Sequence, residues 1–155
     1  MTIEIPHYGR LDIRHIVCDY NGTIAKDGHL LPGVKELFDE LSRHCKIHVV
    51  TADTFGSVRK ELEKCDVAIE VLQSDDHTHE KAAFVESLGC GHCVSLGNGN
   101  NDVQMLRASK LGIVIVGDEG CSGRTLAAAD IVCRSVSDAL ELFVHPKRLI
   151  ATLRC

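Results

Sequence analysis

The chain has 155 residues, of which 45% are hydrophobic and 25% charged, and its formal net charge at pH 7 is −5. This composition is typical of a globular protein and excludes a disordered or membrane-embedded chain. The acidic balance disfavours nucleic acid as a partner, because a nucleic-acid-binding domain needs a basic surface. The length predicts a single domain over residues 1–155.

Nothing in the sequence suggests export or insertion into a membrane. Residues 1–10 lack the apolar core of a signal peptide, and no apolar stretch approaches the ~20 residues needed to cross a bilayer. We therefore expect a cytoplasmic protein with no membrane partner. The eight cysteines lie mostly within strand-like or helix-like runs, and we expect most of them to be reduced, buried side chains.

The hydrophobic pattern alternates between strands and helices along the chain. Strands are expected over residues 2–6 and 10–18, forming a hairpin, and a helix follows Pro32. The elements expected after it are strands at 47–51, 68–72, 93–96, 112–116 and 131–133, and helices at 58–65, 78–88, 101–109, 123–128 and 136–154, the last interrupted at Pro146. This alternation predicts an α/β fold, a doubly wound parallel sheet with helices on both faces.

Polar side chains follow several of these strands. Asp19 ends the strand over 10–18, Thr51 ends the strand over 47–51, and the polar run 97–102 follows the strand over 93–96. Lys81 lies near the start of the helix over 78–88. In a doubly wound sheet the ligand site lies beyond the carboxyl ends of the strands, so we expect two carboxylates, a hydroxyl and an ammonium group to meet there.

These residues resemble, in order, the four motifs of the haloacid dehalogenase-like superfamily of aspartate-nucleophile phosphotransferases. The matching positions are Asp19-Tyr20-Asn21-Gly22-Thr23, then Thr51, Lys81 and Gly97-Asn98-Gly99-Asn100-Asn101-Asp102. The tail over residues 111–151 is similar to that of the soluble P-type ATPase-like phosphatases in this superfamily. The resemblance implies a Rossmann-like fold and a hydrolase that acts on a small phosphorylated molecule.

The resemblance also implies a role for each matching residue. Asp19 would attack phosphorus and form an aspartyl phosphate, while Thr51 and Lys81 would bind phosphoryl oxygens. Mg²⁺ would be held by Asp19, the backbone carbonyl of Asn21, Asn98 and Asp102, because this cation prefers oxygen ligands. The phosphate site would be completed by Gly22, Thr23, Ala52 and Asn101.

Two amides depart from the family pattern. Asn21 stands where these phosphatases usually have an aspartate that protonates the leaving group, and an amide cannot do this near neutral pH. Asn98 stands where they commonly have a metal-binding aspartate, so we expect Mg²⁺ to bind weakly and Asp102 to be the more dependable ligand. The missing acid predicts substrates with good leaving groups, such as acyl or aryl phosphates, and a slowly hydrolysed phosphoenzyme.

Other interpretations remain open at this stage. The two amides also fit a catalytically attenuated phosphate-binding or regulatory protein. Cys90 and Cys93 match a dithiol redox motif, and together with His77 and His79 they could form a zinc site. Asp53 could shape the phosphate pocket or cap the following helix, a role for which Thr54 competes.

Little sequence separates the motifs. The intervals from Asp19 to Thr51 and from Thr51 to Lys81 leave room for about one helical excursion each, so we expect no large cap domain and an open site. The N-terminal hairpin is a candidate interface for a homo-oligomer that would cover such a site. An open site carries no specificity pocket that would identify the substrate.

Overall fold

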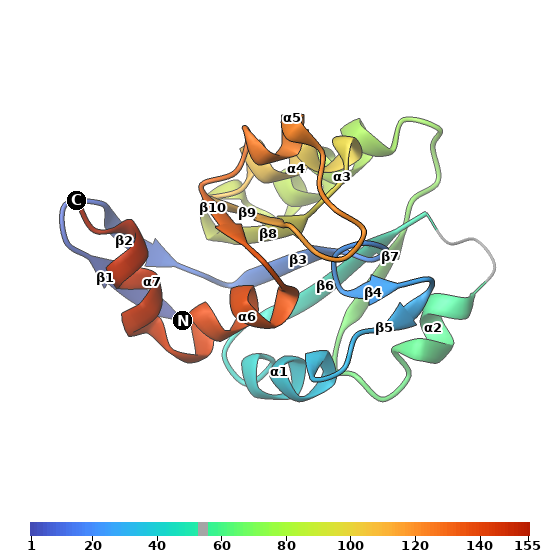
Figure 1. Ribbon diagram of the computed structural model, residues 1–155, viewed down its shortest axis with the longest axis horizontal. Helices are drawn as coiled ribbons and strands as arrows, with labels where there is room; N and C mark the ends of the chain where they lie inside the picture. The colour runs from blue at the N-terminus through green and yellow to red at the C-terminus, as the bar shows by residue number, and fades with distance from the viewer. Residues whose placement is uncertain (53–55) are drawn as a thin grey trace.

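A six-stranded parallel sheet forms the centre of the computed structural model, which describes residues 1–52 and 56–155 (Figure 1). Its strand order within these residues is β10-β9-β8-β3-β6-β7, and all neighbouring strands are parallel. The strands are β3 (His15–Asp19), β6 (Lys46–Thr51), β7 (Ala68–Val71), β8 (Cys93–Gly97), β9 (Leu111–Ile115) and β10 (Ile131–Cys133). The predicted parallel sheet is confirmed, whereas the alternatives for Asp53 and Thr54 lie outside the described residues.

Helices cover both faces of the sheet. On one face α1 (Val34–Leu41) packs against α6 (Val136–Val144), and on the other α3 (His77–Leu88) packs against α4 (Val103–Ala108) (Figure 1). Two shorter helices, α2 (Ser57–Glu61) and α5 (Gly123–Leu126), lie in the connections, with the 3-10 turns η1 (Cys90–His92) and η2 (Asn100–Asp102). Within residues 1–52 and 56–155, no large cap domain interrupts this arrangement.

Strand β3 shows why the sequence forms this sheet. Ile16 and Cys18 enter the core on the side of α1 and α6, and Val17 enters the core on the side of α3 and α4. All three are fully buried. A strand covered on both faces is apolar without alternation, which is the pattern that precedes Asp19 in the sequence.

The N-terminal region departs from the expectation of one strand over 10–18. The structure has an antiparallel hairpin, β1 (Thr2–Ile5) and β2 (Gly9–Asp12), and only then β3. The strand breaks at residues 13 and 14, because these neighbours bind different segments. The Ile13 N–H donates to the Met1 carbonyl, and the Arg14 N–H donates to the His92 carbonyl. A second small hairpin, β4 (Ala25–Lys26) and β5 (His29–Leu30), follows Asp19 and was not predicted.

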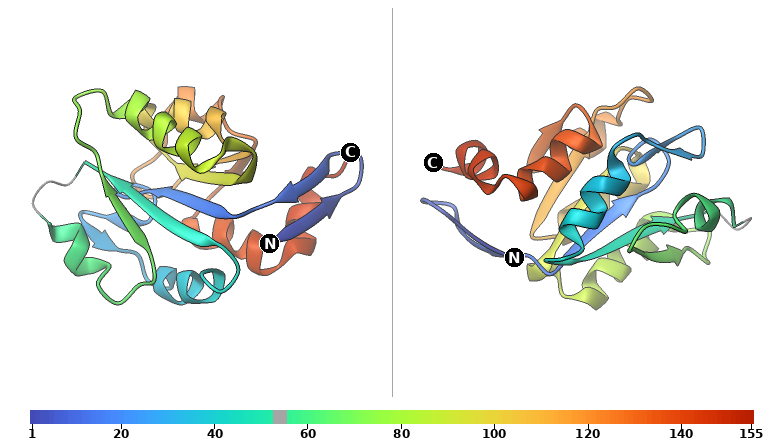
Figure 2. Two further views of the ribbon diagram at one scale, coloured as in Figure 1. Left: turned by 180° about the vertical axis from the view of Figure 1, so that it is seen from behind. Right: turned by 90° about the horizontal axis from the view of Figure 1, so that it is seen from below.

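The hairpin buries its apolar face within this chain. Ile3, Ile5 and Leu11 belong to the main core, and α7 (Pro146–Leu153) packs along β1 (Figure 2). The expected interruption at Pro146 is therefore the start of a separate helix. The apolar residues of the hairpin are thus covered within one chain. A homo-oligomer through this hairpin stays a prediction.

The cysteines differ in how far they are buried. Four of the eight cysteines, Cys18, Cys45, Cys93 and Cys133, are buried, three are partly exposed and Cys155 is exposed, so the expectation that most are buried holds for only half of them. The predicted helix over 101–109 is divided into η2 and α4.

No helix in the described part of the chain is long and apolar enough to cross a membrane.

A histidine pair joins β3 and β6, with His48 buried and His15 partly exposed. His48 Nε2 is 3.0 Å from His15 Nδ1, and the His48 ring packs edge-on against Phe84. Burial lowers the pKa of His48 to about 4, and the positive charges of His15 and Lys46 act in the same direction.

This shift predicts a pH-dependent stability. The unfolded chain binds a proton at this position below pH 6.5 and the folded chain only below about 4, so acidification through this window favours unfolding. We expect the contribution of His48 to the free energy of unfolding to fall by roughly 1–2 kcal/mol. Urea unfolding of wild type and His48→Gln across this range should show the difference, and parallel curves would contradict it.

Candidate active site

Asp19 is the last residue of β3, and both of its carboxylate oxygens have partners. Oδ1 accepts a hydrogen bond from Lys81 Nζ at 2.6 Å, and Oδ2 lies 3.1 Å from the hydroxyl of Thr23. The side chain is nearly buried but still lines a pocket at the carboxyl edge of the sheet. These contacts fix the carboxylate in one orientation.

Lys81 joins two carboxylates in the interior. Its Nζ lies 2.6 Å from Asp19 Oδ1 and 2.7 Å from Asp102 Oδ1, and the residue is only 1% exposed. Burial by itself lowers the pKa of Lys81, but the two carboxylates outweigh this effect and raise the pKa overall. The sequence prediction that Asp19, Lys81 and Asp102 meet in space is therefore matched by the structure.

Asp102 is fully buried, and its second oxygen organises the loop after β8. Oδ2 accepts the backbone N–H groups of Asn98 and Gly99, each at 2.9 Å. A Cβ on Gly97 would lie 2.5 Å from Asp102 Cγ, so only glycine allows this approach. Asp102 thus positions Lys81 through Oδ1 and the backbone of the loop after β8 through Oδ2.

The electrostatics of this cluster follow from its burial. Burial raises the pKa of the Asp19 carboxyl above its usual range, and the negative charge of Asp102 raises it further. Lys81 and the Thr23 hydroxyl act in the opposite direction. With both carboxylates ionised, Asp19, Asp102 and Lys81 carry one net negative charge, which a bound cation would more than balance.

One pocket, of about 240 Å³, collects most of the residues predicted for the site. Thr23, Gly22 and Asp102 do not line it, but each contacts a residue that does: Asp19, Asn98 and Lys81 respectively. Two lining residues were not predicted: Tyr20, which lies within the first motif, and Leu72, which follows β7 at the same sheet edge. The pocket is lined by Asp19, Tyr20, Asn21, Thr51, Ala52, Leu72, Lys81, Asn98, Gly99 and Asn101.

Oxygen atoms suited to a divalent cation converge beside the pocket. Asp19 Oδ2 and Asn98 Oδ1 lie 3.1 and 3.3 Å from the same Thr23 hydroxyl. A carboxylate and an amide oxygen placed this close together are ligands that Mg²⁺ accepts. The donor set therefore fits such a cation, with Asp19 and Asn98 better placed than Asp102.

The zinc hypothesis is wrong for this fold. His77 and His79 begin α3, whereas Cys90 and Cys93 follow its opposite end, and a helix of 12 residues is about 18 Å long. Among the described residues, no group of three His, Cys, Asp or Glu side chains could hold a metal ion.

The dithiol hypothesis is also disfavoured. Cys93 is buried at the start of β8, and burial, followed by the charge of Cys90, raises the pKa of its thiol to about 11. The reactive thiol of such a dithiol is the first of the two, placed at a helix N-terminus that favours the thiolate, whereas Cys90 starts only the three-residue 3-10 turn η1. Neither cysteine lines the pocket around Asp19.

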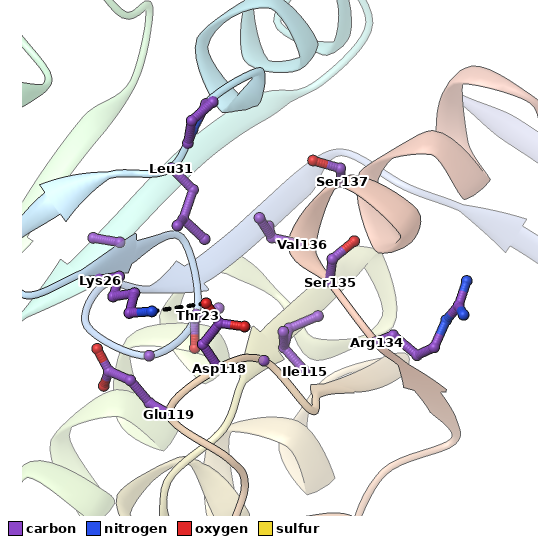
Figure 3. A pocket seen from close by; sticks show the side chains of 14 residues that line it. Thr23, Lys26, Leu31, Ile115, Asp118, Glu119, Arg134, Ser135, Val136 and Ser137 are labelled. Carbon is purple, nitrogen blue, oxygen red and sulfur yellow. Dashed lines mark hydrogen bonds and ion pairs between the residues drawn. The ribbon is translucent and has the colours of Figure 1, made fainter.

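A second pocket, of about 250 Å³, lies on the other side of the turn that follows Asp19. Gly22 and Thr23 line it, together with the ion pair between Lys26 and Asp118 (Figure 3). Lys26 Nζ lies 2.8 Å from Asp118 Oδ2. The ion pair fastens the β4–β5 hairpin to the loop after β9.

Comparisons with curated proteins give two informative relatives, and no protein-family model matches the sequence. The chain is 26% identical over 123 residues to a soluble P-type ATPase-like phosphatase of Methanocaldococcus jannaschii, covering 77% of this chain and 45% of that protein. It is 44% identical over 61 residues to an uncharacterized protein of the same organism, covering 39% of this chain and 66% of that protein. The chain thus spans less than two thirds of the length of each.

Solved structures resemble the chain over most of its length. The 3-deoxy-D-manno-octulosonate 8-phosphate phosphatase of Moraxella catarrhalis, bound to magnesium and phosphate, has a TM-score of 0.73 at 17% identity, covering 92% of this chain and 94% of that one. A putative hydrolase of the haloacid dehalogenase superfamily from Legionella pneumophila has a TM-score of 0.68 at 14% identity, covering 92% and 87%. A phosphoserine phosphatase has a TM-score of 0.67 at 16% identity, covering 83% and 98%.

The contact between Gly22 and Asn98 yields a test of the site geometry. A Cβ on Gly22, whose φ is +80°, would lie 2.3 Å from Asn98 Nδ2, whereas Gly28 has φ +81° and open space around it. Both alanine substitutions cost about 1–2 kcal/mol for the left-handed backbone. Only Gly22→Ala must also displace Asn98, which we expect to add about 1–3 kcal/mol.

Urea unfolding of Gly22→Ala and of its matched control Gly28→Ala measures this difference. The side-chain amide signals of Asn98 in NMR spectra should move in the first variant and stay in place in the second. Equal losses of stability in the two variants would contradict the contact.

Proposed function

We propose that this chain, whose fold is that of the haloacid dehalogenase-like phosphatases, is a Mg²⁺-dependent phosphohydrolase that acts through an aspartyl phosphate on Asp19. The observation that carries the proposal is the Asp19 carboxylate, which faces a pocket while Lys81 and Thr23 hold its oxygens. A buried carboxylate held beside an ammonium group is a suitable nucleophile for phosphorus. The names of the structural neighbours, which include two phosphatases, support this choice.

The reaction takes place in two displacements. An oxygen of Asp19 attacks phosphorus, the bond from phosphorus to the leaving group breaks, and the leaving group departs with the electron pair. Water then attacks the aspartyl phosphate, which releases inorganic phosphate and a proton and restores the carboxylate. Lys81 and Thr51 stabilise the negative charge on the phosphoryl oxygens in both steps.

A divalent cation fits this site. Asp19, Asn98 and the backbone carbonyl of Asn21 would hold Mg²⁺, which supplies positive charge against the phosphoryl oxygens when bound. Asp102 contributes by holding Lys81 and the backbone of Asn98. The magnesium bound to the Moraxella catarrhalis phosphatase supports a divalent cation in this position.

The substrate follows from the amide at position 21. Asn21 is exposed and lines the pocket, where a general acid would protonate the leaving group. Because an amide cannot do so, we propose a small phosphorylated substrate whose leaving group needs no proton, such as an acyl or aryl phosphate. The same lack of a base slows attack by water, so the aspartyl phosphate is long-lived.

A second candidate function is phosphate binding without turnover, which the amides Asn21 and Asn98 favour. Such a protein would bind inorganic phosphate in the same pocket and release none from a substrate. The two functions share the pocket and differ in whether Asp19 forms a covalent bond.

Substitution of the nucleophile separates these functions. We expect Asp19→Asn to lower phosphate release from acetyl phosphate by about 10³-fold or more, because an amide is not a nucleophile here. Asp39→Asn, a carboxylate-to-amide change on α1, should match wild type. Activity that survives in Asp19→Asn would exclude the nucleophile, whereas a wild type that binds phosphate without turnover would support the second function.

Restoring a carboxylate at position 21 tests the substrate class. We expect wild type to hydrolyse acetyl phosphate and an aryl phosphate far faster than an alkyl phosphate. Asn21→Asp should raise the alkyl phosphate rate by ~10²- to 10⁴-fold and change the acetyl phosphate rate less, because only the poor leaving group needs the proton. Equal wild-type rates on the three substrates would refute the dependence on leaving group.

A further inference from the structure

The amide of Asn98 is bound by a segment far from the four motifs. Its Nδ2 donates to the backbone carbonyl of Gly120 at 3.2 Å, and the backbone N–H of Ser122 donates to the Asn98 carbonyl at 2.8 Å. Position 98 is thus connected, through both its side chain and its backbone, to the loop between β9 and α5.

The same segment holds the next residues of the motif. The Thr125 hydroxyl, which is fully buried, donates to the Gly99 carbonyl at 2.6 Å. The Ser122 hydroxyl contacts Asn100 Oδ1. We call residues 120–125 the clamp segment, because these contacts fix the loop that carries Asn98.

The loop that leads into the clamp segment is anchored to the β4–β5 hairpin. The Gly120 N–H donates to the Gly117 carbonyl at 2.9 Å, and Asp118 pairs with Lys26 on β4 (Figure 3). The carbonyl of Gly120 therefore has a fixed position, and it presents only an acceptor to the side chain of Asn98.

This arrangement sets the orientation of the amide. A carbonyl needs a donor opposite it, so the nitrogen of Asn98 must face Gly120 and its oxygen must face Thr23 and Asp19. Asn98 Oδ1 lies 3.3 Å from the Thr23 hydroxyl, whose single hydrogen is shared between this oxygen and Asp19 Oδ2. Gly22 packs against the same amide and leaves it no room to turn away.

We propose that Asn98 is a specificity-determining residue, which the Gly120 carbonyl selects as an amide so that the site offers a neutral oxygen in place of a carboxylate. An aspartate would bring an oxygen without a hydrogen to within about 3 Å of another acceptor, and the hydrogen bond to Gly120 would become a repulsion. The clamp segment therefore favours an amide over a carboxylate at position 98.

The neutral oxygen determines what the site binds. The net charge of Asp19, Asp102 and Lys81 is −1, and a carboxylate at position 98 would make it −2 before a phosphoryl dianion arrives. The amide lowers the affinity for the cation and reduces the repulsion of the dianion, so phosphate binding depends less on the metal than it would beside a carboxylate. This ligand rests on the proposed function, whereas the selection of an amide by Gly120 does not.

Asn98→Asp tests the proposal, with Asn101→Asp as the matched control. Both variants add one carboxylate to the same pocket, but only position 98 contacts Gly120. In EDTA at pH 7, we expect Asn98→Asp to unfold at a lower urea concentration than the control and to shift the backbone amide signals of Gly120 and Ser122. The control should leave those signals in place.

Binding of inorganic phosphate in EDTA, measured by calorimetry, tests the ligand. We expect wild type to bind phosphate and Asn98→Asp to bind it at least about tenfold more weakly. Asn98→Ala, which removes the donor without adding charge, should shift the Gly120 and Ser122 signals and keep phosphate binding within a few-fold of wild type. This variant keeps the test usable if Asn98→Asp does not fold.

Two results would overturn the inference. Unchanged stability and unchanged Gly120 and Ser122 signals in Asn98→Asp would refute the selection of an amide. Equal phosphate binding by Asn98→Asp and wild type would refute its effect on the ligand. Neither readout uses turnover, so a failure of the proposed hydrolysis, seen as activity that survives Asp19→Asn, is a separate result.

Discussion

The buried ammonium group of Lys81 is the interaction on which the site depends. It binds Asp19 and Asp102 at once, although these residues lie 62 and 21 positions away in the chain. Two carboxylates and an ammonium group are costly to remove from water, and they are tolerated because they pair with one another and with further donors. The ion pairs therefore tie β3, α3 and η2 together at the point where the pocket forms.

The supporting contacts extend this principle outward from the charges. Asp102 receives two backbone N–H groups from the loop after β8, and Thr23 holds the second oxygen of Asp19. Gly22 and Gly97 leave space for these approaches, because a Cβ at either position would collide with a side chain of the site. Backbone conformation and side-chain charge are thus matched, which gives a fixed carboxylate at the edge of the sheet.

The two amides have different physical meanings. Asn21 is exposed in the pocket, so its proposed effect is chemical, because an amide gives up no proton near neutral pH. Asn98 is bound to the Gly120 carbonyl, so its effect begins with structure, and an amide satisfies the clamp segment as a carboxylate would not. The departure from the family pattern is thus chemical at position 21 and structural at position 98.

The sequence alone determined the parallel sheet and brought Asp19, Thr51, Lys81 and residues 97–102 to one edge, because hydrophobic periodicity locates strands and the carboxyl ends of parallel strands coincide. The tertiary structure decided how these groups bind one another: that both oxygens of Asp102 are engaged, that the N-terminal strand breaks at residues 13 and 14, and that residues 120–125 hold Asn98. Those features consist of hydrogen bonds between residues distant in the chain, and such bonds leave no periodic signal in a sequence.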